Sequence, residues 1–111
     1  MANPHAGEVA LVVDGERRVM KLTLGALAEM EASLGAESLV DLVARFESGG
    51  YRARDVMAIL LAGLRGGGWQ GAAGDLAGAV IEGGPLAAAR AAAALLARAF
   101  TPAGEGGDAP D

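Results

Sequence analysis

The absence of cysteine and the scarcity of histidine exclude most of the common catalytic and metal sites. Without cysteine the chain has no disulfide, no thiol nucleophile and no thiolate ligand for a metal. The one histidine, His5, stands alone, so a histidine-based triad and a multi-histidine metal site are both excluded. No other catalytic constellation is found. We therefore expect no enzymatic activity, no cofactor, no metal and no small-molecule substrate.

The chain also has few basic residues and no long apolar run. Nine Lys and Arg stand against 14 Asp and Glu, which gives a formal net charge of −5. Without a basic surplus the chain is poorly suited to neutralise phosphates, so no nucleic-acid partner is expected. No stretch reaches the roughly 18 apolar residues of a membrane span, and the opening MANPHAGE lacks the features of a signal peptide. These absences predict a cytoplasmic protein that does not bind membranes.

Aromatic residues make up only 4% of the chain, although hydrophobic residues make up 52%. The apolar side chains are thus mostly Ala, Leu and Val, which favours closely packed helices. A length of 111 residues suits a single domain. We expect a flexible N-terminus at residues 1–7, one domain over residues 8–100, and a disordered Gly- and Pro-rich tail at residues 101–111.

The first part of that domain reads as a β-hairpin. Glu8–Val13 (EVALVV) is rich in β-branched residues, Asp14-Gly15 is a turn signal, and Arg18–Leu22 alternates. A four-residue loop from Asp14 to Arg17 would collect the apolar side chains on one face, so burial favours it.

The two possible loops predict different strand partners. The favoured four-residue loop pairs Val9 with Leu22, Leu11 with Met20, and Ala10 with Lys21. A two-residue loop at Asp14-Gly15 would instead place Leu11 opposite Arg18.

Helical spacing of apolar residues follows the hairpin. Thr23 and Ser38 are the expected N-caps of the first two helices, and glycines separate the helices. The predicted ranges are Leu24–Leu34, Leu39–Glu47, Ala53–Leu64, a weaker Ala72–Ile81, and Leu86–Phe100. The expected fold is α+β, mostly α, with an N-terminal β-hairpin and a bundle of four to five short helices. Its expected core contains Leu27, Met30, Leu34, Leu42, Phe46, Leu60 and Leu64.

Five residues are candidates for contact with a partner protein. Val12 lies on the outward face of the expected hairpin, and Trp69 is interpreted first as a core anchor and second as a contact residue. Ala88, Ala92 and Leu96 mark an Ala-rich face of the last helix, where an internal seam and an interface are equally compatible with the sequence. The Gly-rich segment 63–68 follows a helix and lacks a Lys-Ser/Thr ending, so we interpret it as a helix end and turn rather than a phosphate loop.

Three stretches resemble a known family. The stretch VDGERRVMKLTLGALAEMEASLG (13–35) resembles the opening of small tail assembly proteins of gene transfer agents, which are phage-like particles encoded by α-proteobacteria. DVMAILLAGLRGGG (55–68) and GGPLAAARAAAALLARAF (83–100) are similar as well, and the likeness spans about residues 7–100. The first stretch carries the most specific matches, at Asp14, Gly15, Leu22, Thr23, Gly25, Ala26, Leu27, Ala28, Glu29, Glu31, Leu34 and Gly35.

The resemblance implies a tail assembly chaperone. Such proteins coat the tape measure protein while the tail tube polymerises around it, and they are absent from the finished particle. The alternative is a structural tail subunit, a tube or connector component of the gene transfer agent particle. Tube subunits are built on β-sandwiches or barrels, which need many strands, so two strands followed by helices favour the chaperone.

Weak self-association is a further expectation. Neither proline nor an inward charge blunts the edge of Val9–Val13, and the Ala-rich last helix permits close approach. A protein that coats a filament in many copies needs heterologous contacts, so we expect concentration-dependent head-to-tail oligomers.

Overall fold

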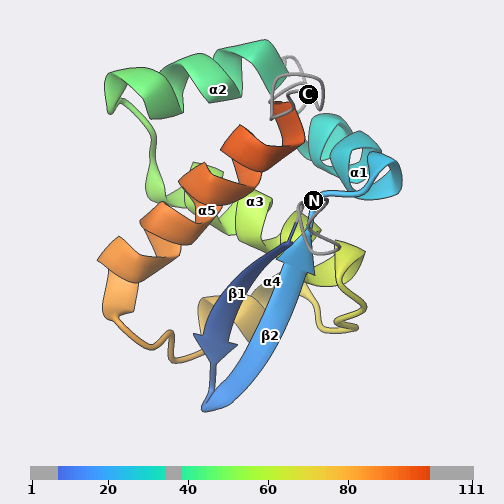
Figure 1. Ribbon diagram of the computed structural model, residues 1–111, viewed down its shortest axis with the longest axis vertical. Coiled ribbons are helices and arrows are strands. Elements are labelled where there is room, and N and C mark those ends of the chain that lie inside the picture. The colour runs from blue at the N-terminus through green and yellow to red at the C-terminus, as the bar shows by residue number, and fades with distance from the viewer. Residues whose placement is uncertain (1–7, 35–38, 101–111) are drawn as a thin grey trace, which may run out of the picture.

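A two-stranded antiparallel sheet is followed by five helices within residues 8–34 and 39–100, which the computed structural model describes (Figure 1). This arrangement confirms the predicted fold class. The expectations for residues 1–7, Gly35, Ser38, the tail from residue 101 and the side chain of Leu34 lie outside the described part. The elements are β1 (Glu8–Val13), β2 (Glu16–Lys21), α1 (Leu24–Leu34), α2 (Leu39–Ser48), α3 (Ala53–Gly66), α4 (Ala73–Ala77) and α5 (Gly84–Phe100).

The hairpin has the two-residue loop, so the four-residue loop predicted on burial grounds is wrong. Leu11 pairs with Arg18, and Val9 pairs with Met20. The reason is the turn itself, since Asp14 and Gly15 have φ values of 52° and 81°. A tight hairpin turn requires positive φ at both central residues, and Asp-Gly supplies it at low cost.

A third extended segment follows α4 and pairs with the turn end of β1. The Asp14 amide donates to the Val80 carbonyl at 2.8 Å, and the Glu82 amide donates to the Val12 carbonyl at 3.0 Å. The Asp14 carboxylate also accepts from the Val80 amide at 2.8 Å. The helix expected over Ala72–Ile81 is therefore only the short α4, and the β-branched residues beyond it extend along β1.

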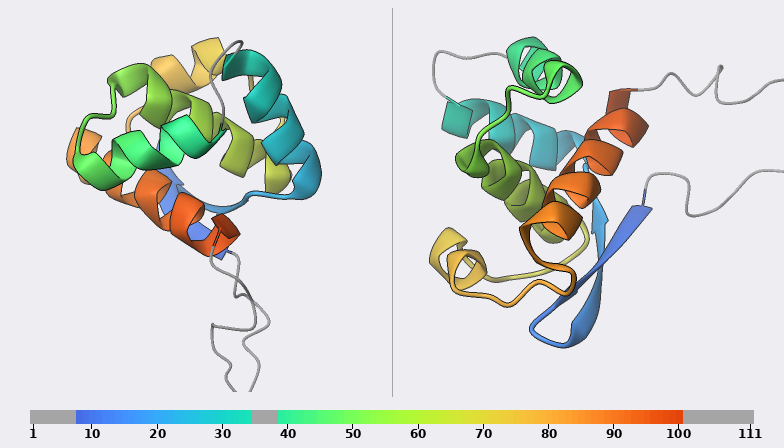
Figure 2. Two further views of the ribbon diagram at one scale, coloured as in Figure 1. Left: turned by 90° about the horizontal axis from the view of Figure 1, so that it is seen from above. Right: turned by 90° about the vertical axis from the view of Figure 1, so that its left-hand side faces the viewer.

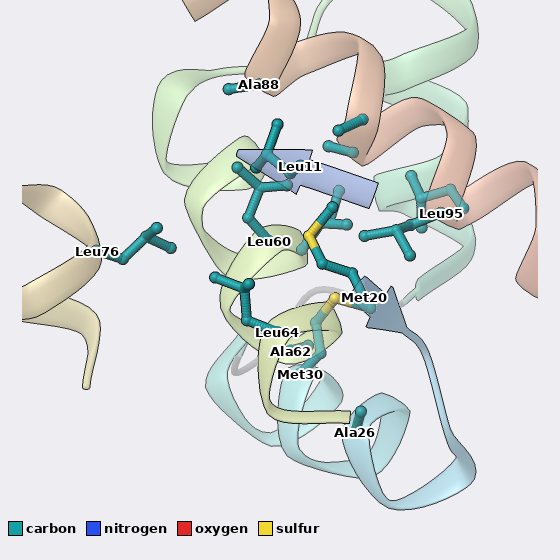
Figure 3. Close-up of a cluster of buried hydrophobic side chains, with 14 of the residues drawn as sticks. Leu11, Met20, Ala26, Met30, Leu60, Ala62, Leu64, Leu76, Ala88 and Leu95 are labelled. Atoms are coloured by element: carbon teal, nitrogen blue, oxygen red, sulfur yellow. The ribbon is translucent and has the colours of Figure 1, made fainter. Parts of the chain in front are cut away.

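Helix α3 is central and contacts β2, α1, α4 and α5. The hairpin and α2 lie at opposite ends of the molecule (Figures 1 and 2). In the close-up of the core, Met20 lies between Met30 and Leu95, and Leu76 points from α4 toward α3 (Figure 3). Hydrophobic side chains from both strands and all five described helices thus form one core.

Most of the predicted core is buried. Met30, Leu42, Leu60 and Leu64 are at most 2% exposed. Leu27 and Phe46 are only partly buried but pack against the core. The predicted cap on α1 is confirmed, because the Thr23 hydroxyl accepts the Ala26 amide at 3.0 Å.

Two glycines at the end of α3 allow the helix to lie directly against β2. An added Cβ on Gly66 would lie 1.9 Å from the Lys21 carbonyl oxygen, and one on Gly67 would lie 1.9 Å from the Val19 carbonyl oxygen. Any larger residue would force the helix away from the strand. The Gly-rich segment therefore ends a helix, as predicted, and also brings it onto the outer edge of the sheet.

Candidate protein-interaction surface

The five residues predicted to contact a partner do not form one surface. Ala88, Ala92 and Leu96 are at most 8% exposed and belong to the core, so this face of α5 is an internal seam. Trp69 is partly buried and packs against the core. Val12 is partly buried on the hairpin, on the opposite face from the core residue Leu11. The open surface of α5 lies to either side of its buried face.

On one side, β1 and α5 form a shallow groove of about 450 Å³. Val12 lines it together with Ala91 and Ala94 of α5, and Arg17 and Arg90 add charge. The carbonyl of Val12, which points outward from the sheet, already accepts the Glu82 amide. The turn end of this strand edge is therefore occupied by the chain itself.

On the other side, α2 and α5 form a second groove of about 320 Å³, which we call the α2–α5 groove. In Figure 1 α2 crosses the top of the molecule and α5 rises obliquely toward it, so that the second half of α5 shares the groove with α2. All but one of the side chains that line the groove are apolar, and the exception is a carboxylate of α2. The lining residues are Val43, Phe46 and Glu47 of α2 and Ala93, Leu96, Ala97 and Phe100 of α5.

The sequence gives α2 one strongly apolar side, and few of its side chains are fully enclosed. Leu42 is the anchor, with no exposed surface. The Phe46 ring stacks on the Tyr51 ring, with centroids 4.6 Å apart and planes 11° apart. Tyr51 lies just beyond the Gly49-Gly50 break, so the chain turns back far enough for its ring to stack on Phe46. Phe46, a lining residue of the α2–α5 groove, therefore has an aromatic neighbour.

A buried ion pair fastens α2 to α3. The carboxylate of Asp55 is 1% exposed and accepts two hydrogen bonds from the Arg45 guanidinium, from Nε at 3.1 Å and from Nη2 at 2.9 Å. Asp55 also accepts the backbone amide of Arg52 at 2.8 Å, which caps the start of α3. One carboxylate thus joins two helices and satisfies an otherwise unpaired amide.

The surroundings of Asp55 change the pKa of its carboxyl group in two opposite directions. Burial alone would raise the pKa of the Asp55 carboxyl. The hydrogen bonds from Arg45 and from the Arg52 amide, with the charges of both guanidinium groups, outweigh burial and lower the pKa of Asp55 below its usual value. The carboxylate stays charged and bound, so it is not available as a general acid or base.

Residues 8–34 and 39–100 contain no cluster of three or more His, Cys, Asp or Glu residues placed to hold a metal ion. None of the described helices has the length and apolar character needed to cross a membrane. Apolar grooves of this kind are among the surfaces that accept an amphipathic helix.

Of the residues that line this groove, the sequence predicts only Leu96 as a residue that contacts a partner. Phe46 was assigned to the core, and Phe100 was placed only as the end of the last helix. One available signal was the scarcity of aromatics, because a large ring at the exposed end of an Ala-rich helix is unusual. A second signal was Asp55 in the first turn of α3, because an acidic residue three positions after the N-cap commonly accepts the backbone amide of the cap residue.

Residues 6–101 match a family model described as phage tail tube protein, GTA-gp10. The match includes every described strand and helix. No curated protein and no solved structure shows significant similarity to the chain.

Proposed function

The chain belongs to the family of the phage tail tube protein GTA-gp10 and is a tail protein of the gene transfer agent type, and we propose that it serves as an assembly chaperone for the tape measure protein. In this role it covers the tape measure protein until the tail tube replaces it.

The observation that carries the proposal is the small, capped sheet. Tube subunits are built on β-sandwiches or barrels, and neighbouring subunits need sheet surface for contact. In the described part of this chain the sheet has two strands. Val80–Glu82 covers the turn end of one outer edge, and Gly66–Gly67 lies against the other. A mostly helical protein with little free sheet edge is better suited to binding helices than to building a tube.

The physical task of a chaperone also suits the chain. A tape measure helix exposes apolar stripes before the tube surrounds it, and such stripes aggregate. A small helical protein covers them by accepting the helix in a groove. A net charge of −5 on each bound copy keeps the coated filament soluble. Many weak copies provide avidity and still allow displacement.

The second candidate is a structural tail subunit, a tube or connector component. The description of the matching family names a tail tube protein, and so it supports this candidate more directly than it supports the chaperone. The two candidates differ in what the chain does alone. A tube subunit polymerises with copies of itself into tubes, whereas a chaperone forms at most weak oligomers until its client is present.

Co-expression with the tape measure protein of the same gene transfer agent tests the proposal. We expect the tape measure protein to be insoluble alone, to become soluble with this chain, and to copurify with several copies of it. Electron microscopy of the chain alone should show no tubes or rings. Tubes formed by the chain alone, together with no binding to the tape measure protein, would establish the structural subunit instead.

A further inference from the structure

We infer that the outward face of α5 binds the same face of a second copy of this chain, so that two antiparallel α5 helices form a closed two-fold dimer. The face consists of Leu86, Arg90, Ala93, Ala97 and Phe100, and we call it the α5 stripe. Such a dimer forms without the tape measure protein, so it goes beyond the proposed function and does not depend on it.

The α5 stripe is exposed and has the spacing of a surface that packs on another helix. Its members follow one another at intervals of four, three, four and three residues, which keeps them on one side of a helix. All of them are exposed, Leu86 to 59% and Phe100 to 44%. The buried residues of α5 face the core from the opposite side. This helix therefore has apolar surface on two sides, and the described part of the chain covers one of them.

The large side chains of the α5 stripe lie symmetrically about its middle. Ala93 is seven residues from Leu86 and seven residues from Phe100. When two copies lie antiparallel about an axis at Ala93, the Leu86 end of each helix meets the Phe100 end of the other. The small side chain at the axis lets the two helices approach closely between these larger contacts. A surface with this symmetry suits a copy of itself, because a two-fold interface uses the same patch twice.

Charge complementarity favours the antiparallel direction. Arg90 lies on the first half of the α5 stripe, whereas Ala97 and Phe100 on its second half line the α2–α5 groove together with Glu47. In the antiparallel dimer, Arg90 of each copy lies against the second half of the other α5, beside the groove that Glu47 lines. Both side chains are exposed, and neither forms an ion pair within the part of the chain that the structure describes. The dimer thus pairs each exposed cation with a carboxylate of the other copy.

Other arrangements and occupants fit less well. A parallel dimer would place the two Arg90 guanidinium groups at one level, where like charges repel, and would leave both Glu47 carboxylates without a cation. Residues 101–111 have the sequence TPAGEGGDAPD, which contains no large apolar side chain and three acidic ones. A second copy supplies both the apolar surface and the cation that the groove requires.

The small size of the contact implies a weak dimer. Helix α5 has 17 residues, which corresponds to a length of about 25 Å. Contact along one such helix from each copy, with part of α2, buries less surface than a permanent dimer requires. The dimer should therefore dissociate on dilution.

Sedimentation velocity of the purified chain tests the dimer. We expect monomer at low concentration and a reversible dimer, with no larger species, as the concentration rises toward the millimolar range. Ala93→Arg places two like charges at the two-fold axis and should weaken dimerisation at least tenfold. Its matched control is Ala44→Arg, at an exposed alanine of α2 that does not line the groove, and it should stay within twofold of the unmodified chain.

A charge exchange tests the direction of the helices. Arg90→Glu and Glu47→Arg should each weaken dimerisation, because each brings like charges together. The double variant restores the pair with reversed polarity and should recover dimerisation. Arg98→Glu, at an exposed position outside the α5 stripe, makes the same change in net charge as Arg90→Glu and should have little effect. Thermal melts by circular dichroism verify that each variant is folded.

Several results would overturn the inference. A single species at monomer mass up to the millimolar range would do so, as would equal dimerisation by folded stripe variants and controls. Failure of the double variant to recover dimerisation would contradict the antiparallel pairing. Species that grow beyond the dimer would indicate the head-to-tail contact expected from the sequence instead. If Ala93→Arg abolished tape measure binding and left self-association unchanged, the face would belong to that partner.

Discussion

Removal of the Asp55 carboxylate should destabilise the protein more than any surface substitution. Asp55→Ala removes the carboxylate that accepts hydrogen bonds from the Arg45 guanidinium, whose side chain is 20% exposed, and from the Arg52 amide. Breaking a buried ion pair by removing one partner costs about 3–5 kcal/mol. Because Arg45 is partly exposed, water can solvate it, and we expect the free energy of unfolding to fall by about 3 kcal/mol.

A double-mutant cycle separates the ion pair from the cap. Arg45→Ala, Asp55→Ala and the double variant are compared by urea unfolding at pH 7. We expect a coupling energy of about 1–3 kcal/mol between the two side chains. Part of the loss in Asp55→Ala should remain in the double variant, because the cap on α3 is still missing.

The same pair predicts the direction of a pH effect. Because the pKa of Asp55 is lowered in the folded protein, its contribution is fully present above the pKa of an unfolded Asp, about 3.9. The contribution is lost as the pH falls through the lower folded value. The difference in stability between the unmodified chain and Asp55→Ala should thus be constant near neutrality and shrink below about pH 4. A loss under about 0.5 kcal/mol at pH 7, or a difference that grows on acidification, would refute the reasoning.

Three further predictions concern packing and association. Leu42→Ala should lower the free energy of unfolding by about 2–5 kcal/mol, because it opens a cavity under α2. Leu27→Ala should lower it less, since Leu27 is only partly buried. Thermal melts rank the two variants. Gly67→Ala should destabilise the fold through its clash with the Val19 carbonyl, whereas Gly74→Ala, which meets open space in α4, should stabilise it by up to about 1 kcal/mol. Urea unfolding measures both, and equal effects would contradict the close approach of α3 to β2. Because the Glu82 amide already occupies the edge at Val12, assembly through the β1 edge is restricted to the end of the strand away from the turn, and Val12→Lys should change it little in sedimentation velocity; a marked loss of assembly would place the contact at the side chain of Val12.

Local patterns in the sequence were sufficient for most elements. The apolar spacing from Leu24 and the cap at Thr23 predicted α1, because side chain and backbone satisfy each other within one turn. The Ala-rich run predicted α5, where helix propensity and burial agree.

The errors came where two local signals competed or where distant segments met. In the hairpin the apolar pattern favoured one register, and the Asp14-Gly15 turn chemistry favoured the other, which prevailed. The pairing of Val80 with Asp14 joins residues 66 positions apart, so no local pattern could reveal it. The α2–α5 groove arises in the same way, from Phe46 and Phe100 on helices that meet only in the fold.

The composition of finished particles tests the central claim most directly. Gene transfer agent particles are purified, and this chain is counted against the structural tail proteins by quantitative mass spectrometry, with the producing cells analysed in parallel. The chaperone role predicts abundant chain in the cells and none, or a trace, in the particles. A fixed copy number in purified particles, comparable to that of the structural tail proteins, would contradict it and identify the chain as part of the tail.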